Sequence, residues 1–349
     1  MEIFAGLKPT LFAKGIEKAM KKTIYIFSDG DLQRKDNTIR FATDEGKRFL
    51  PVEDINEIFL FGEINLNKRL LEFLSQKEIL VHYFSYFGYY MGTFYPREHY
   101  NSGYMILRQA ESYLDYIKRL EIAKQFVVGA VENIKKVLRY YLNRGKEIEA
   151  TIKKIENLEQ SLPHCTTIEE LMALEGNIRN HYYKSFDSIL GNPHFVFEER
   201  TRRPPKNHLN SLISFGNSIL YTYILSEIYR THLDPRIGFL HATNFRRFSL
   251  NLDVAEIFKP IIIDRLIFTL ISKKMITRSD FVKEMGGIVI KESARKKFIE
   301  ELDKRLKVTI KHRSTGREVS YRRLIRLELY KLQKHLMNEE VYEPFVAQW

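Results

Sequence analysis

The chain has 349 residues. Because single hydrophobic cores stop growing at about 250–300 residues, this length favours two domains over one. Hydrophobic residues make up 44% of the chain and charged residues 29%, which excludes a disordered protein. The formal net charge of +12 favours a polyanionic partner, nucleic acid before an anionic membrane. The single cysteine, Cys165, excludes an internal disulfide and a cysteine-based zinc site, and it favours a reducing compartment.

The charge is unevenly distributed along the chain. Residues 1–100 contain 14 basic and 14 acidic residues, so the remainder, with 42 basic and 30 acidic residues, carries the whole surplus. A surplus that serves solubility alone would be spread evenly, so this distribution favours nucleic-acid binding by the second part. No apolar run reaches the ~20 residues of a membrane-spanning helix, and the N-terminus lacks the apolar core of a signal peptide. We therefore expect no membrane partner and a cytoplasmic location.

Residues 1–19 are predicted to be an extension, since Met20 opens a run that leads directly into a strand; a short helix packed on the fold is the alternative. Residues 20–96 are predicted to form a β-rich domain with one short helix, Leu66–Gln76. Its expected strands are Thr23–Phe27, Thr38–Ala42, Ile58–Phe61, Ile79–Phe84 and Tyr89–Tyr95. Because this domain is neutral and aromatic, we expect it to serve packing or dimerisation.

The polar run from Pro96 to Gly103 contains both Pro and Gly, so residues 97–103 are predicted to be the linker. From residue 104 to 349 the apolar residues recur with a helical period, so the fold class is α+β, with a small β-rich domain followed by a larger helical one. The expected helices are Ile106–Asn143 (one long helix or two abutting ones), Ile148–Leu162, Thr167–Ile189, Asn210–Tyr229, Pro260–Ser272, Glu292–Lys307 and Ser320–Met337. Val308–Lys311 is β-prone.

Glu175 is the first residue with candidate chemistry. Thr167 and Glu170 form a predicted capping box at the start of its helix. Glu175 lies at helical spacing with Leu171 and Ile178, so it should share their apolar face. A buried carboxylate needs a counter-charge, so either a metal ion or a salt bridge to an arginine of another helix is expected.

A second group comprises His241, Asp253 and Glu256. Asp253 and Glu256 are three residues apart and would lie side by side on a helix, where like charges repel unless a cation intervenes. The alternative is that one carboxylate caps the helix and the other is exposed. His241 lies twelve residues before Asp253, and a lone histidine is usually structural. Three carboxylates and one imidazole would suit Mg²⁺ or, because of the imidazole, Mn²⁺, and such a site catalyses phosphoryl transfer.

Basic runs around these residues would form the DNA track, and aromatic side chains would stack on bases. The residues that we assign to DNA contact are Arg202, Arg203, Asn210, Tyr221, Arg246 and Arg247.

The order of several motifs resembles the CRISPR-associated integrase-endonuclease family, the larger of the two universal spacer-acquisition proteins, over residues 20–349. These motifs are Ile24-Tyr-Ile-Phe-Ser-Asp-Gly30, Leu174-Glu175-Gly-Asn, Arg203-Pro-Pro-Lys-Asn-His-Leu-Asn210-Ser-Leu-Ile-Ser-Phe-Gly216, Gly238-Phe-Leu-His241, Leu252-Asp253-Val-Ala-Glu256-Ile-Phe-Lys-Pro and Tyr342-Glu-Pro-Phe345. The N-terminal half resembles most the type I branch, subtype I-B. Asn217 stands where the family often has tyrosine, and residues 1–19 match no family feature.

The resemblance implies a sandwich-like N-terminal domain, an all-helical catalytic domain and a prokaryotic cytoplasmic protein. It implies Mn²⁺ or Mg²⁺ bound by Glu175, His241 and Glu256, with Asp253 as a supporting catalytic residue. It further implies a homodimer, a small ferredoxin-like spacer-acquisition partner, and insertion of double-stranded DNA spacers into a CRISPR array by 3′-hydroxyl attack at the repeat edge. The alternatives are a non-catalytic architectural DNA-binding protein and a junction-resolving repair nuclease.

Overall fold

A computed structural model describes residues 21–96, 100, 102–243, 248–284, 286–311 and 316–348. The chain divides into two compact units, which comprise the described residues of 1–86 with 91–97 and those of 87–90 with 98–349. The predicted extension 1–19 lies outside the described residues, as do 97–99 and 101 of the predicted linker. Among the described helices, none is long and apolar enough to cross a membrane.

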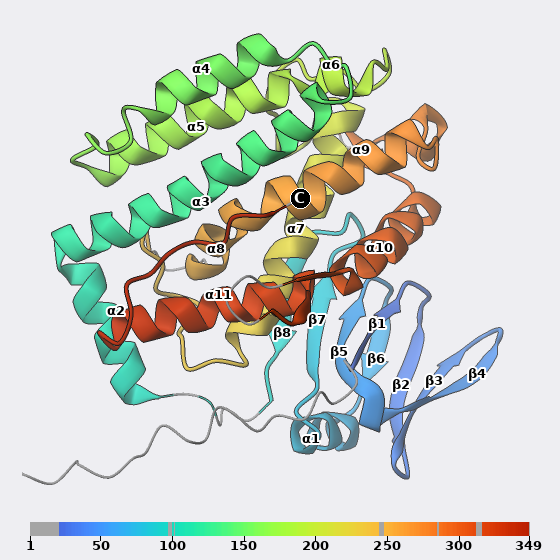
Figure 1. Cartoon of the computed structure of the whole chain (residues 1–349). Helices are drawn as coiled ribbons and strands as arrows, with labels where there is room; N and C mark the ends of the chain where they lie inside the picture. The colour runs from blue at the N-terminus through green and yellow to red at the C-terminus, as the bar shows by residue number, and fades with distance from the viewer. Residues whose placement is uncertain are drawn as a thin grey trace, which may run out of the picture. The chain divides into compact units, whose positions relative to one another are not determined.

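The first unit contains two four-stranded sheets and one helix (Figure 1). One sheet has the order β1-β5-β7-β8, in which β1, β5 and β7 run parallel, and the other has the order β4-β3-β2-β6. The elements are β1 (Lys22–Ile26), β2 (Gly30–Lys35), β3 (Thr38–Thr43), β4 (Gly46–Pro51), the 3₁₀ turn η2 (Val52–Asp54), β5 (Ile55–Leu60), β6 (Ile64–Leu66), α1 (Lys68–Gln76), β7 (Leu80–Phe84) and β8 (Tyr90–Phe94).

Both sheets contribute to one apolar core. Ile26 of β1 and Ile58 of β5 are buried together with Leu32 of β2 and Ile39 of β3. Burial of one face of each sheet against the other is the arrangement of a β-sandwich. The prediction of a β-rich, sandwich-like N-terminal domain is therefore confirmed.

The second unit is mainly helical, as predicted. Its helices are α2 (Gly103–Leu114), α3 (Tyr116–Leu142), α4 (Glu149–Glu159), α5 (Ile168–Lys184), α6 (Phe186–Leu190), α7 (His208–Ile228), α8 (Leu250–Lys259), the π-helical turn η3 (Pro260–Asp264), α9 (Arg265–Ser272), the 3₁₀ turn η4 (Arg278–Asp280), α10 (Glu292–Lys307) and α11 (Tyr321–Leu336). It also contains two short antiparallel ribbons, which the all-helical expectation missed except at Val308–Lys311. They are β9 (Phe281–Glu284) with β10 (Gly287–Ile290), and β11 (Thr309–Lys311) with β12 (Glu318–Ser320).

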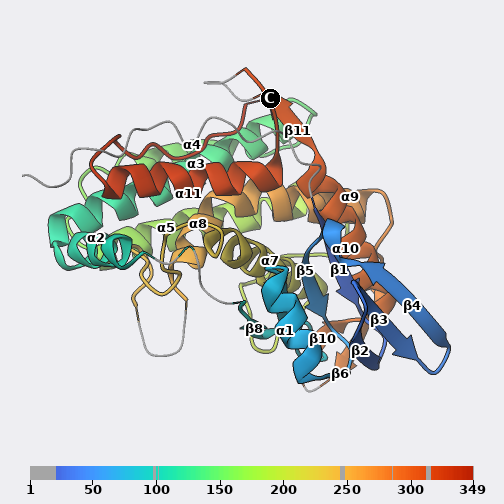
Figure 2. The same ribbon diagram turned by 90° about the horizontal axis from the view of Figure 1, so that it is seen from below.

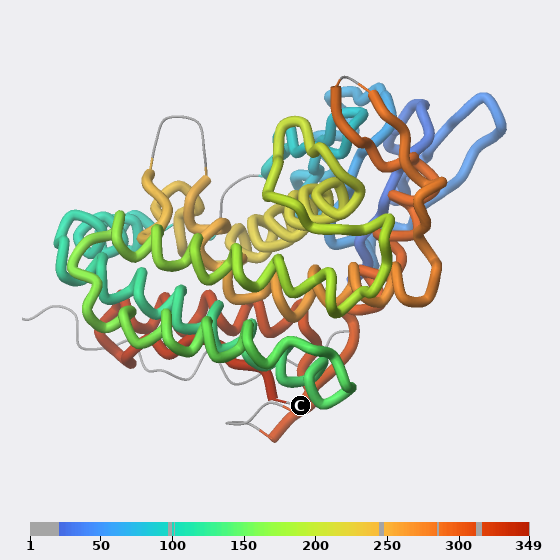
Figure 3. Tube along the Cα trace, turned by 90° about the horizontal axis from the view of Figure 1, so that it is seen from above, coloured from blue at the N-terminus to red at the C-terminus, as the bar shows by residue number. Residues whose placement is uncertain are grey.

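Helix α8 lies in the interior of this unit, where it contacts α3, α7 and α11 (Figures 1 and 2). Nearly all of its residues are buried, including the charged residues Asp253, Glu256 and Lys259. The α4–α5 hairpin lies along α3 (Figure 3). This packing brings a face of α5 toward the buried polar side of α8.

The C-terminal segment is attached to α3 by one buried side chain. The Asn133 amide donates to the carbonyls of Ile257 and Phe345, at 2.9 and 3.0 Å, and accepts from the Ala347 amide at 2.8 Å. The Phe345 ring stacks on Phe258 of α8. The Tyr-Glu-Pro-Phe motif thus supports α8 on the side of α3.

Candidate active site

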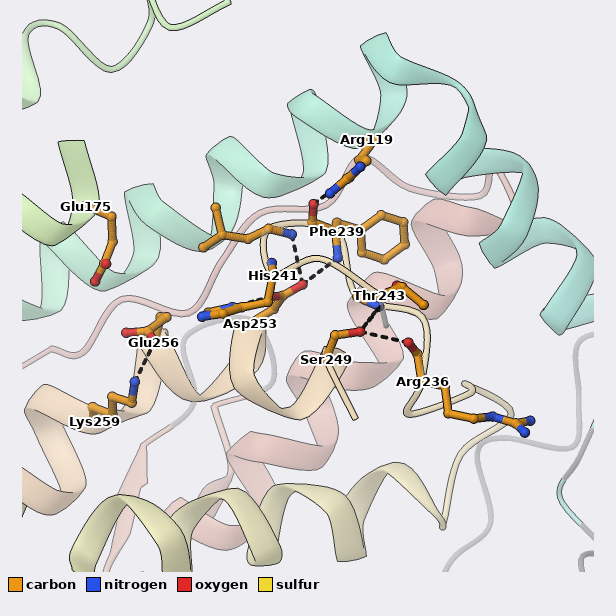
Figure 4. Close-up of polar contacts among 12 residues, drawn as sticks. Arg119, Glu175, Arg236, Phe239, His241, Thr243, Ser249, Asp253, Glu256 and Lys259 are labelled. Atoms are coloured by element: carbon orange, nitrogen blue, oxygen red, sulfur yellow. Dashed lines mark hydrogen bonds and ion pairs between the residues drawn. The ribbon is translucent and has the colours of Figure 1, made fainter. Parts of the chain in front are cut away.

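The loop that ends at His241 is held by helices α2 and α3. The Gln109 amide donates to the carbonyls of Asp234 and Ile237 and accepts from the Asp234 amide at 2.7 Å. The Arg119 guanidinium donates to the Phe239 carbonyl at 2.9 Å (Figure 4). Because both helices hold its backbone, this loop has a defined position relative to α8.

The carboxylate of Asp253 organises the end of the loop (Figure 4). One oxygen accepts from the backbone amides of Phe239 at 2.5 Å and Leu240 at 3.0 Å. The other accepts from the backbone amide of His241 at 2.9 Å and from its imidazole Nδ1 at 2.8 Å. Asp253 is fully buried, so neither a helix cap nor an exposed position describes it. These four hydrogen bonds assign Asp253 to positioning the loop and the histidine.

The hydrogen bond at Nδ1 determines what His241 can do. In the neutral ring it places the proton on Nδ1 and leaves the Nε2 lone pair available, the arrangement seen where a carboxylate orients a metal-binding histidine. Burial lowers the pKa of His241, but the hydrogen bond to Asp253 and the charges of Asp253 and Glu256 outweigh burial and raise it. The side chain keeps 28% of its surface exposed, so a ligand can reach it.

Glu256 lies one helical turn after Asp253 and is paired differently. One oxygen accepts from Lys259 Nζ at 2.5 Å, and the other accepts from the Arg179 guanidinium of α5. Burial opposes ionisation of this carboxyl, yet the charges of Lys259 and Arg179 lower its pKa from 4.5 to about 2. The like-charge conflict predicted for Asp253 and Glu256 is therefore avoided because each carboxylate has its own donors.

Glu175 faces the same region from α5, as the helical spacing predicted. The capping box of Thr167 and Glu170 is present at the start of the helix. Glu175 is partly buried, and one of its oxygens accepts from Arg179 Nε at 3.0 Å. The expected arginine partner is thus present, although it comes from the same helix and not from another one.

Asp264, at the end of η3, is a further buried carboxylate near this site. It is fully buried, and no hydrogen bond of good geometry reaches its oxygens among the described residues, although the neighbouring Tyr182 hydroxyl lies close enough to act on the carboxylate as a donor and helps to lower its pKa. Burial raises the pKa of Asp264 from 3.8 to about 7, against the lowering effect of the nearby charge of Arg179.

Figure 4 shows Glu175, His241 and Glu256 pointing toward one region from α5, the loop and α8. Within the part of the chain that the structure describes, however, no three His, Cys, Asp or Glu side chains are grouped closely enough to hold a metal ion. In the structure, the two glutamates are instead paired with Arg179 and Lys259. Sequence reasoning missed both cations, although Arg179 lies four residues after Glu175 and Lys259 three residues after Glu256, the spacings of helical ion pairs.

The residues predicted to contact DNA are in varied environments. Arg202 and Arg203 are exposed on the segment before α7. Asn210 is fully buried; its amide donates to the Glu199 carbonyl and accepts from Arg200, so it can act on DNA only through Arg200. The ring of Tyr221 is partly buried, with Lys259 Nζ at 5.0 Å from its centre. Arg246 and Arg247 lie outside the described residues.

The family model for the CRISPR associated protein Cas1 matches residues 24–304, which include all four residues of the candidate site. This chain belongs to the Cas1 family. It is 62% identical over 330 residues to a CRISPR-associated endonuclease Cas1 of Thermodesulfovibrio yellowstonii, covering 95% of this chain and 100% of that protein. The family resemblance found in the motifs is therefore confirmed.

Solved structures agree with this assignment. A Cas1 protein from Thermotoga maritima is similar with a TM-score of 0.83 and 45% identity, over 93% of this chain and 99% of that chain. A casposase bound to an integration product has a TM-score of 0.83 and 23% identity, over 93% of both chains, a likeness that concerns the fold. The order of a β-rich unit and a helical unit is thus the Cas1 order.

Proposed function

We propose that this Cas1 family member is a metal-dependent DNA endonuclease and integrase that inserts short DNA into a CRISPR array. The observation that carries the proposal is the hydrogen bond between Asp253 and His241 Nδ1, which leaves Nε2 available beside Glu175 and Glu256. A buried carboxylate that orients a partly exposed imidazole beside two more carboxylates is unusual for a purely structural contact. The similar proteins named as endonucleases support the same class of reaction.

By the chemistry of their donor atoms, Glu175, His241 and Glu256 suit Mn²⁺ or Mg²⁺, although the described structure does not group three such side chains closely enough to hold an ion. Glu175 and Glu256 would supply oxygen ligands and His241 a nitrogen ligand, a combination that suits a hard divalent ion and favours Mn²⁺. Glu256 is already ionised because its pKa is about 2. When bound, the ion would supply Lewis-acid stabilisation of charge on the phosphate oxygens. Asp253 would hold the imidazole through the hydrogen bond to Nδ1.

The reaction that we propose is transesterification at the repeat edge. A 3′-hydroxyl of the incoming DNA attacks the phosphorus, one P–O bond forms to the repeat, the P–O bond to the 3′-oxygen of the DNA flanking the repeat breaks, and the proton passes through solvent to that oxygen. One phosphodiester replaces another, so no nucleotide cofactor is consumed. Lys259 would remain beside the phosphate as a cation, and Arg202 and Arg203 would bind the flanking backbone.

The assembly that we propose contains double-stranded DNA, a homodimer through the β-rich unit, and a small ferredoxin-like partner protein. The neutral charge of residues 1–100 and the surplus of basic residues after them support this division between protein contacts and DNA contacts. We further propose that the system is of type I, subtype I-B, because the N-terminal motifs resemble that branch most. We also propose that the protein acts in the prokaryotic cytoplasm.

The test is an integration assay with a supercoiled repeat plasmid, labelled spacer DNA, the partner protein and Mn²⁺. We expect His241→Ala and Glu256→Gln to lose strand transfer by at least ~10²-fold while keeping DNA affinity. His164→Ala, a change of an exposed histidine outside the site, is the matched control and should be fully active. Integration by wild type in excess EDTA, or by His241→Ala at the wild-type rate, would refute the metal-dependent mechanism. DNA binding with no strand transfer by wild type would favour an architectural protein.

A further inference from the structure

Three arginines and three tyrosines come together where four helices of the second unit approach one another. Arg144 follows the end of α3, Arg265 is the first residue of α9, and Arg305 lies in the last turn of α10. The tyrosines come from the last turn of α3 and the first residue of α11 (Figure 1). These six residues, which we call the arginine–tyrosine cluster, are Arg144, Arg265, Arg305, Tyr140, Tyr141 and Tyr321.

The Tyr140 ring contacts two of the three cations. The guanidinium carbon of Arg144 lies 3.7 Å from the ring centre, and that of Arg265 lies 4.5 Å from it. Each contact is a favourable cation–π interaction, but two positive charges at one ring also repel each other. Arg144 has neither a hydrogen bond nor an ion pair with any residue that the structure describes, so no described carboxylate offsets its charge.

Arg305 brings a third cation to the cluster. Its Nε and Nη2 both donate to the Ile261 carbonyl, at 3.0 and 2.6 Å, and its guanidinium carbon lies 5.8 Å from the ring centre of Tyr321. Within the described residues, Nη1 has no hydrogen-bond partner, and it is not one of the buried atoms that lack a partner, so it faces solvent. Burial and the charge of Arg265 lower the pKa of Arg305 from 12.5 to about 10. A partly buried arginine is normally paired with an anion, and here the described residues supply none.

A phosphate group is the anion that fits this arrangement. Arginine N–H groups match phosphate oxygens in geometry, and a guanidinium held against an aromatic ring is already partly ordered before it binds. The Tyr141 hydroxyl has no hydrogen-bond partner among the described residues and is not a buried atom without one, so it is a further donor open to solvent. The alternative is that the cluster only joins helices, in which case DNA should leave it unaffected.

We propose that the arginine–tyrosine cluster binds a phosphate of the nucleic-acid backbone. The surplus of basic residues after residue 100 favours a polyanion over a free phosphate ion. The bound phosphate is not the one that reacts, because Arg265 lies nine residues, or roughly 13 Å of helical rise, beyond Glu256. The cluster therefore anchors DNA at a distance from the proposed reaction, and it would do so equally in a protein that binds DNA without cutting it.

The first test is an arginine footprint of the full-length protein with phenylglyoxal, read by mass spectrometry. We expect duplex DNA to slow the modification of Arg144 and Arg265 several-fold, whereas inorganic phosphate at the same concentration of phosphate groups should protect them little. Arg139 is the internal control, since it is an exposed arginine of the same helix that is paired with Glu156, and DNA should not change its modification. Protection by inorganic phosphate but not by DNA would overturn the assignment to nucleic acid.

The second test measures binding of a labelled duplex by fluorescence anisotropy over a range of salt concentrations. Replacing Arg144 and Arg265 together by glutamine should weaken binding at least ~10-fold and reduce the slope of log affinity against log salt by about 0.9, the value for one phosphate. Arg139→Gln removes the same charge from the same helix and should keep the wild-type slope. Because Arg144 is exposed, Arg144→Gln alone should keep the wild-type unfolding temperature and weaken binding in the same direction.

The outcomes separate this site from the proposed reaction. A wild-type slope in the double variant, with the DNA affinity of wild type intact, would overturn the phosphate site alone. Failure of the wild-type protein to bind DNA would overturn both the site and the proposed function. Protection of Arg144 and Arg265 by DNA, in a protein that shows no strand transfer, would support the site and count against the proposed reaction.

Discussion

Replacing Asp253 by asparagine tests whether this residue controls the tautomer of His241. Asparagine has nearly the same shape but offers one oxygen and one NH₂ group where aspartate offers two acceptors. All four hydrogen bonds of Asp253 are accepted ones, two at each oxygen. The NH₂ group must therefore face two donors, whichever way the amide is oriented.

The two orientations differ in their consequences. With NH₂ toward Phe239 and Leu240, two backbone hydrogen bonds are lost. With NH₂ toward His241, one backbone bond is lost and the imidazole can compensate by moving its proton to Nε2 and accepting at Nδ1. Since hydrogen bonds to charged groups contribute ~1.5–3 kcal/mol, the second orientation loses less, and we expect a destabilisation of about 2–3 kcal/mol.

The second orientation also places a proton on the nitrogen that would bind the metal. We therefore expect Asp253→Asn to bind Mn²⁺ ~10- to 100-fold more weakly than wild type, with a matching loss of strand transfer. Urea unfolding gives the stability, calorimetry gives the affinity, and ¹⁵N-histidine NMR gives the tautomer, with His241 assigned by comparison with His241→Gln. A variant with wild-type Mn²⁺ affinity and the proton still on Nδ1 would refute this reasoning.

Further predictions concern the loop, the C-terminal segment, a buried charge and the DNA track. Gly238→Ala would place a Cβ 2.7 Å from a backbone carbon and 2.8 Å from a carboxylate oxygen, so strand transfer should fall at least ~10-fold while circular dichroism stays native. Asn133→Ala leaves two buried backbone groups and one partly buried one unpaired, and should destabilise the protein by about 3 kcal/mol in urea unfolding. Because the pKa of Asp264 in the folded protein lies above its ordinary value of 3.8, the free energy of unfolding of the wild type should fall as the pH rises from 3.8 to about 7. The stability of Asp264→Asn relative to wild type should therefore increase over that range, and the two should differ little below it. Arg202→Gln and Arg203→Gln should each reduce the slope of log affinity for DNA against log salt by about 0.9, as measured by fluorescence anisotropy, if each contacts one phosphate.

Local patterns in the sequence were enough to predict most of the fold. Strand alternation and helical periodicity located β1, β3, β5, β7, β8 and most of the helices to within a few residues, but β2, β4, β6 and α8 were not predicted. The open question of one or two helices in Ile106–Asn143 is decided by Asp115, whose carboxylate accepts from the amides of Ile117 and Lys118 and so starts a new helix. The two-stranded ribbons were harder to predict because strands of three or four residues show too few alternations to define a period.

The candidate site was predictable in its residues but not in its pairings. Helical spacing placed Glu175 on an apolar face and set Asp253 beside Glu256, and all three carboxylates are at least partly buried. The roles diverge because of contacts distant in sequence: a loop folds back on Asp253, and α5 brings Arg179 to Glu256. The spacing of residues within one helix contains no information about partners from elsewhere in the chain. The structure was therefore needed to show that Asp253 positions the loop and that Glu256 is paired with Arg179.

The charge balance of the site bears on how a DNA-binding surface tolerates buried carboxylates. Without counter-ions, Glu175 and Glu256 would repel a phosphate at the place where the reaction is proposed to occur. Arg179 and Lys259 carry as many positive charges as Glu175 and Glu256 carry negative ones, so these four side chains together present no net repulsion and we expect the site to admit DNA. A divalent ion that enters adds two positive charges to a neutral cluster, an excess that Asp264 and a DNA phosphate can each reduce. Metal and DNA should therefore strengthen each other's binding, and the order in which they arrive need not be fixed.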